Sequence, residues 1–265
     1  MIGIFDSGVG GLSVMKELIA ALPDYQITYF GDTARVPYGN KSKETVTRYA
    51  LEDANFLIKK GAKLIVVACS TATALALDTL TKKLDIPVIG VAEPSIKAAI
   101  EATRNQRIGV IGTRGTIESK IYQKLAKKIN PKVKIYPQSC PLLVPLVEEN
   151  WIKKPETRRI LKKYLRPLKT AQVDTLILGC THYPLLEKTI QEIAGKRIAL
   201  VSPGKETAKA VQRLIDNNSD LRKSLKKKKK YRFYASDTSG EFKQIGNRFL
   251  GRRIGKLAKA NVENL

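Results

Sequence analysis

An apolar run that ends in a cysteine and a hydroxyl residue occurs twice in this chain, and this repeat limits the fold more than any other feature. The first copy is LIVVACST at 64–71 and the second is LILGCTH at 176–182, so Cys69 and Cys180 lie 111 positions apart (180 − 69). Two further pairs of apolar segments recur at spacings of 106 and 110 residues: 3–6 with 109–112, and 88–91 with 198–201. A nearly constant spacing predicts two related α/β units, each with one thiol at a strand end.

Short apolar runs alternate with amphipathic stretches along almost the whole sequence. Strands are expected at 2–5, 27–31, 64–68, 88–91, 108–112, 133–136, 175–179, 198–201 and 231–235. Helices are expected at 12–22, 44–60, 73–83, 116–129, 155–169, 185–194 and 205–217. This alternation indicates βαβ units, in which a parallel sheet is covered by helices on both faces.

The two units have no linker rich in Pro, Gly or Ser between them, so they are expected to pack closely. Their boundary is predicted near residues 94–104, and a second crossover is predicted near Gly204. Residues 217–230 are polar and basic, which predicts a loop.

The carboxyl ends of the predicted strands are where a parallel sheet gathers its functional groups. The residues at or just past such ends are Asp6, Asp32, Cys69, Glu93, Gly112, Cys180 and Ser202. Cys69 and Cys180 are each followed by a strand-to-helix turn, whose backbone N–H groups and helix dipole stabilise a thiolate. Two facing thiols suit a reaction that removes and adds a proton on opposite faces of one carbon, which is the chemistry of a racemase. Cys140 has no counterpart in the repeat and is expected to be structural.

Two further residues lie close to these thiols in the predicted topology. His182, the single histidine, lies two residues after Cys180 and is a candidate for proton transfer. A Cys–His hydrolase stays open as an alternative, although it would leave Cys69 without a purpose. Asp6 begins the turn DSGVGG at 6–11. A dinucleotide fingerprint that starts at Gly8 would have its third glycine at position 13, where this chain has Ser13. The Asp6 carboxylate would repel a pyrophosphate, so a residue that orients a base is the better interpretation.

Composition and cysteine usage narrow the class of protein. At 265 residues and 43% hydrophobic content, the chain is long enough for one large or two modest domains. No apolar run reaches the roughly 20 residues that span a bilayer, and the N-terminus lacks the segments of a signal peptide. Three cysteines do not form a disulfide scaffold, so a reducing cytoplasm is the expected location. None of the spacings of a zinc site occurs, so no metal is expected.

The charge balance is strongly basic, with 48 Lys and Arg against 24 Asp and Glu and a formal net charge of +24. Such a field attracts nucleic acid and other anions. The excess is spread along the predicted helices, and residues 226–230 form the continuous block of lysines. Because no recognition helix or RNA-binding motif accompanies this block, a solvated surface is favoured. A nucleic-acid-associated protein is the alternative from another functional class.

The chain resembles the glutamate racemases, which belong to the cofactor-independent aspartate/glutamate racemase superfamily. The resemblance covers nearly the whole length and rests on these segments: DSGVGG at 6–11, Asp32 through PYG at 37–39, ACSTA at 68–72, VPLVE at 144–148 and GCTHYP at 179–184. It implies two pseudosymmetric α/β domains with mainly parallel sheets and an active site in the cleft between them. The implied domains are residues 1–96 with a returning segment 206–265, and residues 97–205.

By the same resemblance, Cys69 and Cys180 are the two acid–base thiols that interconvert L- and D-glutamate. Asp6 would support Cys69, and His182 with Glu148 would support Cys180. The positions implied to hold the substrate are Ser7, Tyr38, Gly39, Ser70, Thr71 and Thr181. The family uses neither pyridoxal phosphate nor a metal, supplies D-glutamate for bacterial peptidoglycan, and commonly forms homodimers.

One residue departs from the family pattern, which usually has asparagine where Ser70 stands. Serine keeps a hydroxyl donor but lacks the reach and the second polar group of an amide. An unmade polar contact in a closed site costs about 1–3 kcal/mol, which is roughly 5- to 150-fold in transition-state binding. An aspartate or broad-specificity racemase of the same superfamily is therefore the nearest alternative function.

Overall fold

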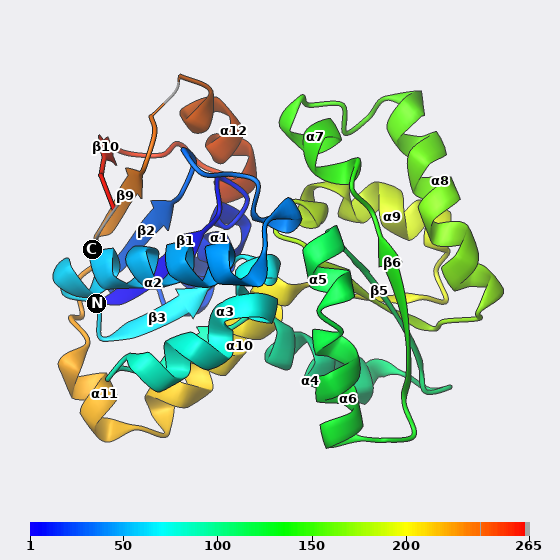
Figure 1. Cartoon of the computed structure of the whole chain (residues 1–265), viewed down its shortest axis with the longest axis horizontal. Coiled ribbons are helices and arrows are strands. Elements are labelled where there is room, and N and C mark those ends of the chain that lie inside the picture. Colours follow the sequence, from blue (N-terminus) through cyan, green and yellow to red (C-terminus); the bar gives the residue numbers. More distant parts are fainter. Residues whose placement is uncertain (239, 263–265) are drawn as a thin grey trace.

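The computed structural model describes residues 1–238 and 240–262, and it contains two β-sheets that lie side by side among helices (Figure 1). The strands of the first sheet are β1 (Ile2–Asp6), β2 (Ile27–Gly31), β3 (Leu64–Val67), β4 (Val88–Gly90), β9 (Tyr231–Ala235) and β10 (Leu257–Lys259). Those of the second sheet are β5 (Arg107–Gly112), β6 (Lys134–Ser139), β7 (Thr175–Gly179) and β8 (Ala199–Val201). Neighbouring strands in both sheets pair in parallel.

The second sheet repeats four adjacent strands of the first. The first sheet has the order β10-β9-β2-β1-β3-β4, and the order β6-β5-β7-β8 of the second corresponds to its last four strands. The equivalent strands β3 and β7 are the ones that lead to Cys69 and Cys180. The repeated sequence segments therefore occupy equivalent places, which confirms the prediction of two pseudosymmetric α/β units. The sequence analysis does not predict β10, which is an edge strand of three residues.

Helices connect the strands and cover the sheets (Figure 1). They are α1 (Leu12–Ala21), α2 (Lys43–Lys59), α3 (Ser70–Lys83), α4 (Ala92–Ala102), α5 (Arg114–Glu118), α6 (Ile121–Ile129), α7 (Leu143–Glu148), α8 (Pro155–Thr170), α9 (Glu187–Ala194), α10 (Pro203–Asp216), α11 (Ser219–Ser224) and α12 (Gly240–Leu250), with 3₁₀ turns η1 (Tyr38–Asn40) and η2 (Tyr183–Leu186). The central strands β1, β2, β3 and β7 are buried along their whole length, as a parallel sheet covered on both faces requires. No helix among the described residues combines the length and the apolar content needed to cross a membrane.

The helices that follow the last strand of each repeat exchange sides. The helix α4 follows β4 of the first sheet but packs against β7 and β8 of the second. The helix α10 follows β8 of the second sheet but packs against α1, which lies beside the first. Because α4 and α10 also contact each other, the chain crosses between the two sheets at adjacent places. The division into residues 1–96 with 206–265 and residues 97–205 stays a prediction.

The structure contains the helices α7 and α12, which the prediction does not include, and it differs from the prediction in further segments. The predicted boundary at 94–104 overlaps α4, which buries Ala92, Ser95, Ile96 and Ala99 on one face at helical spacing. The predicted helix 116–129 is divided into α5 and α6 because Lys120 has a left-handed backbone with a φ of 56°. The predicted loop 217–230 contains α11, in which the Asn218 side chain accepts the N–H of Leu221.

The main chain of the lysine block 226–230 is held by hydrogen bonds, while its side chains lie in solvent. The backbone N–H of Gln26 donates to the Lys226 carbonyl at 3.1 Å, and the N–H of Ile27 donates to the Lys230 carbonyl at 3.1 Å. All five lysine side chains are exposed. The segment therefore runs beside the start of β2, as the interpretation of a solvated surface expects.

Candidate active site

A cavity of about 220 Å³ contains both repeated thiols in its wall. Its lining from the first sheet's side consists of Ser7, residues 36–40, Cys69, Ser70 and Thr71. Its lining from the second sheet's side consists of Thr113, Arg114, Pro141, Val144, Pro145, Glu148, Cys180, Thr181 and His182. The cavity thus collects groups that follow strand ends in both sheets, where such ligand sites occur.

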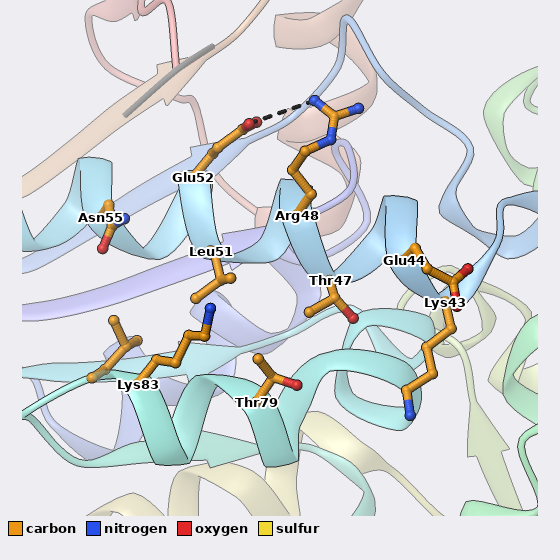
Figure 2. A pocket seen from close by; sticks show the side chains of 10 residues that line it. Lys43, Glu44, Thr47, Arg48, Leu51, Glu52, Asn55, Thr79 and Lys83 are labelled. Atoms are coloured by element: carbon orange, nitrogen blue, oxygen red, sulfur yellow. Dashed lines mark ion pairs between the residues drawn. The ribbon is translucent and has the colours of Figure 1, made fainter.

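Two larger hollows lie elsewhere on the molecule and lack this chemistry. One, of about 700 Å³, lies between α2 and α3. Figure 2 shows Lys43 and Lys83 between these helices, and the ion pair of Arg48 with Glu52 on the side of α2 that faces away from α3. Another, of about 440 Å³, lies beside α8 and α9. Neither lining contains a cysteine or a histidine. The smaller cavity is the candidate because its wall contains thiols and an imidazole, which are nucleophilic and acid–base groups.

Cys69 stands where β3 turns into α3. Its sulfur accepts the backbone N–H of Ala72 at 3.4 Å and lies 3.5 Å from the Ser7 hydroxyl. Burial and the neighbouring Asp6 carboxylate raise the pKa of Cys69 to about 12, although the bonds from Ala72 and Ser7 act in the opposite direction. Cys69 therefore holds its proton at neutral pH and can act as an acid.

Asp6 is the last residue of β1 and is completely buried. Its carboxylate accepts the N–H of Gly8 at 3.1 Å and lies 3.5 Å from the Thr181 hydroxyl. Burial raises the pKa of Asp6, and the charge of His182 and the N–H groups of Gly8 and Gly11 partly oppose this effect. Asp6 thus contacts groups from both halves of the site without lining the cavity itself.

The glycine-rich turn lets these two halves approach. A Cβ atom at Gly11 would lie 2.4 Å from Cβ of Asp6. A Cβ atom at Gly10 would lie 2.5 Å from the Thr181 hydroxyl oxygen and 2.6 Å from the His182 ring. Larger residues would overlap these atoms, so both positions require glycine. The turn therefore serves close packing between the two halves of the site.

Cys180 follows β7 directly and is supported by a histidine and a carboxylate. Its sulfur lies 3.8 Å from Nδ1 of His182, and Nε2 of His182 lies 2.9 Å from Oε1 of Glu148. Burial opposes the charged imidazole, but the bonds to Cys180 and Glu148 raise the pKa of His182 to about 10. His182 is therefore charged at neutral pH and can exchange a proton with Cys180.

The C-terminal segment completes this side of the site, which the sequence does not predict. The Phe249 ring packs edge-on against the His182 ring, with 5.1 Å between the centroids. Arg248 donates to the backbone carbonyl of Glu148 at 3.0 Å. Both residues belong to α12, and no sequence pattern relates this helix to the Cys-Thr-His segment.

The loop 36–40 forms one wall of the cavity and is held by buried charges. The Tyr38 hydroxyl donates to Asp32 and, at 3.0 Å, to Asp53. Arg35 pairs with the same two carboxylates at 2.7 and 3.1 Å. The position of Asp32 at a strand end is the only signal of this network in the sequence, which gives no indication of Arg35 or Asp53.

Hydroxyl groups of Ser7, Ser70, Thr71 and Thr181 line the cavity. The Thr71 hydroxyl lies 2.9 Å from that of Thr113, which follows β5, so this pair joins the two sheets at the cavity wall. The Ser70 hydroxyl is buried and has no hydrogen-bond partner within the described part of the chain. Such a group is available to a bound ligand.

Several residues that the sequence analysis names do not line the cavity: Asp6, Asp32, Glu93, Gly112, Cys140 and Ser202. Glu93 has an exposed side chain on α4 and pairs with Lys97 at 2.6 Å, so it is not a site residue. Cys140 is buried without lining the cavity, and burial raises the pKa of its thiol. Within the described ranges, no three His, Cys, Asp or Glu side chains are arranged to hold a metal ion.

The fold and the paired thiols define a class of protein that comparison with known families identifies. The family model described as Asp/Glu/Hydantoin racemase matches residues 2–211, so the chain is an amino-acid racemase of this family. A glutamate racemase from Geobacter metallireducens is 49% identical over 262 residues, which cover 99% of this chain and 97% of that relative. Within the family, the chain belongs to the glutamate racemases.

Solved structures agree with this assignment. Glutamate racemase isoform RacE1 from Bacillus anthracis is 38% identical, with a TM-score of 0.93 over 98% of this chain and 97% of that one. The glutamate racemase from Francisella tularensis, solved in complex with D-glutamate, is 35% identical, with a TM-score of 0.92 over 100% of this chain and 98% of that one. The predicted α/β architecture with two pseudosymmetric domains is thereby confirmed.

Proposed function

We propose that this protein interconverts L- and D-glutamate by proton transfer between the α-carbon and two thiols, Cys69 and Cys180. The observation that carries the proposal is that one cavity of about 220 Å³ is lined by both thiols. The thiols come from equivalent strands of two matching sheets, so they approach the cavity from its two sides. Membership of the glutamate racemase family supports glutamate over aspartate as the substrate.

The reaction transfers one proton off the α-carbon and one proton onto it. A thiolate on one side removes the α-proton, and the C–H electrons delocalise into the α-carboxylate. The thiol on the other side then donates its proton to the opposite face of the carbon, which inverts the configuration. After each turnover the former thiolate carries a proton and the former thiol has lost one. The neighbouring groups must therefore accommodate either thiol in either protonation state, or return the protons to their starting positions.

The neighbours of the thiols suit this exchange. A cationic His182 beside Cys180 stabilises negative charge on that sulfur and can supply or accept a proton through Nδ1. Glu148 holds the other ring nitrogen and thereby fixes the orientation of the imidazole. Cys69 starts as the protonated partner, with Asp6 buried nearby.

Substrate binding is assigned to the polar lining of the cavity. Ser7, Ser70, Thr71 and Thr181 offer hydroxyl donors, and Tyr38 and Gly39 belong to the loop that forms one wall of the cavity. Donors fixed before the reaction stabilise charge that develops on the substrate carboxylate in the transition state. Exclusion of water from a small cavity strengthens these contacts and makes a thiolate a stronger base.

The physiological proposal is that the enzyme supplies D-glutamate for peptidoglycan in the cytoplasm. Three free cysteines suit a reducing compartment. A homodimer follows from the family resemblance. The exposed lysine block favours binding of nucleic acid only through its positive charge. We therefore assign no nucleic-acid role to it.

The decisive experiment incubates the protein with L- or D-glutamate in heavy water, without any added cofactor. We expect the opposite enantiomer to appear with deuterium at its α-carbon, because the donating thiol carries a solvent-derived proton. Chiral chromatography with mass spectrometry measures both quantities, and L- and D-aspartate are tested beside glutamate. Turnover of aspartate faster than glutamate, or no deuterium in the product, contradicts the proposal.

A further inference from the structure

Arg114 is a cation at the cavity with no counter-charge. It is the first residue of α5 and lines the cavity that contains both thiols. Its side chain is exposed and, among the described residues, takes part in no hydrogen bond or ion pair. An arginine in this position presents five N–H donors and a permanent positive charge to whatever enters.

The other charged groups in the cavity wall neutralise each other. Glu148 and His182 lie 2.9 Å apart and form a pair of opposite charges, because His182 is protonated at neutral pH. Among the described residues that line the cavity, Arg114 is therefore the one charge without a partner. Counted over Arg114, Glu148 and His182, the cavity wall carries an excess of one positive charge before substrate arrives.

The backbone at Arg114 is fixed at the junction of the two sheets. Its neighbour Thr113 caps α5 by accepting the N–H of Thr116 at 3.4 Å, and its hydroxyl also contacts Thr71. A Cβ atom at Gly39 would lie 3.0 Å from Cβ of Thr113, which shows how closely the loop 36–40 approaches this point. Arg114 is thus held at the cavity wall although its side chain is exposed.

We infer that Arg114 determines the preference of this racemase for amino acids that carry a second carboxylate. The inference rests on the proposed function and adds a residue that selects the substrate class. Glutamate carries two carboxylates and one ammonium group, so it brings one net negative charge to the cavity, whereas glutamine brings none. The guanidinium attracts the charged substrate and contributes little to the binding of its neutral isostere.

The test compares Arg114→Gln with Arg114→Lys and with Lys124→Gln. Lys124 lies exposed on α6 and outside the cavity lining, so its substitution removes the same charge from the protein as a whole. We expect Arg114→Gln to raise KM for both enantiomers about 10-fold with kcat within about twofold. Arg114→Lys is expected to restore most of this loss, and Lys124→Gln is expected to resemble the parent enzyme.

Calorimetry measures ligand affinity without turnover, so it tests the role of Arg114 separately from the racemase activity. We expect the affinity for D-glutamate relative to D-glutamine to fall about 10-fold in Arg114→Gln and to remain unchanged in Lys124→Gln. Raising the ionic strength is expected to weaken glutamate binding to the parent more than to Arg114→Gln, because salt screens this attraction. The role of Arg114 is overturned if Arg114→Gln loses the same affinity for D-glutamate as for D-glutamine. It is also overturned if Arg114→Gln and Lys124→Gln bind both ligands equally well. Absence of racemisation in the parent enzyme would instead overturn the proposed function.

Discussion

The two halves of the active site share a backbone plan but differ in their electrostatics. On both sides an interior strand, β3 or β7, leads to a buried thiol. Beside Cys69 the ionisable neighbour is the buried carboxylate of Asp6, which helps to raise the pKa of the thiol. Beside Cys180 it is the imidazole of His182, held by Glu148. Duplication of a fold can place two thiols symmetrically, whereas the different charges beside them come from residues that differ between the two copies.

The chain that follows each thiol explains part of this difference. Cys69 begins the long helix α3, so its sulfur receives the backbone N–H of Ala72. Cys180 is followed by the 3₁₀ turn η2, which contains Pro184 in its first turn. At the position equivalent to Ala72, the N–H of Tyr183 donates to the backbone carbonyl of Cys180 at 3.1 Å, and the contact to the Cys180 sulfur comes from the His182 side chain. One half therefore uses a helix N-terminus, and the other uses a side chain that can itself move a proton.

The largest expected effect comes from removing either thiol. Cys69→Ser and Cys180→Ser are each expected to lower kcat for racemisation by at least about 10³-fold, because each loses the acid or base on one face. Each variant should still exchange the α-proton of a single enantiomer, and the two variants should prefer opposite enantiomers. Deuterium incorporation from L- and D-glutamate, measured separately, reads out both effects.

The matched control for these variants is Cys140→Ser, which alters a buried thiol outside the cavity lining. Normalised to the folded fraction by circular dichroism, its kcat should equal that of the parent. Full turnover by either Cys69→Ser or Cys180→Ser would contradict the two-base mechanism. If both variants exchanged the α-proton of the same enantiomer, the assignment of one thiol to each face of the α-carbon would be wrong.

An intermediate effect is expected from the neighbours of Cys180. His182→Asn removes the group that exchanges a proton with the sulfur, and kcat/KM should fall about 100-fold. Glu148→Gln should cost less, because Glu148 contacts the sulfur only through His182. Since L- and D-glutamate have the same free energy, kcat/KM must fall equally in both directions, and any asymmetry appears in kcat and KM separately. Progress curves from each enantiomer test this, and a larger loss in Glu148→Gln than in His182→Asn contradicts the relay.

The smallest effect is expected in the dependence of stability on pH. The pKa of His182 is raised from 6.5 to about 10 in the folded state, so the folded protein retains this proton where the unfolded chain has lost it. The stabilisation is fully present below pH 6.5 and disappears as the pH rises through about 10. Urea unfolding between pH 6 and 10 should therefore show a steeper loss of stability in the parent than in His182→Asn. Parallel curves for the two proteins would refute the charged pair.

Much of the fold could be predicted from local patterns, because buried parallel strands are continuous apolar runs. The strands at 27–31, 175–179 and 231–235 begin and end where the sequence indicates. The helix α4 was not predicted, although it buries Ala92, Ser95, Ile96 and Ala99 at helical spacing. The break at Lys120 follows from a backbone angle that no residue pattern reveals.

Local sequence patterns identified the two thiols, their equivalent strands, Asp6 and His182, since these residues lie within a few positions of strand ends. Glu148 lies at the end of α7 and was indicated only by the family resemblance. Which groups surround each thiol depends on the tertiary structure. The contacts of Glu148 with His182, of Phe249 with the same ring, and of Arg35 with Asp53 join segments far apart in the chain. Burial and charge pairing depend on such contacts, so the protonation states of Cys69 and His182 follow from the folded cavity and not from local sequence.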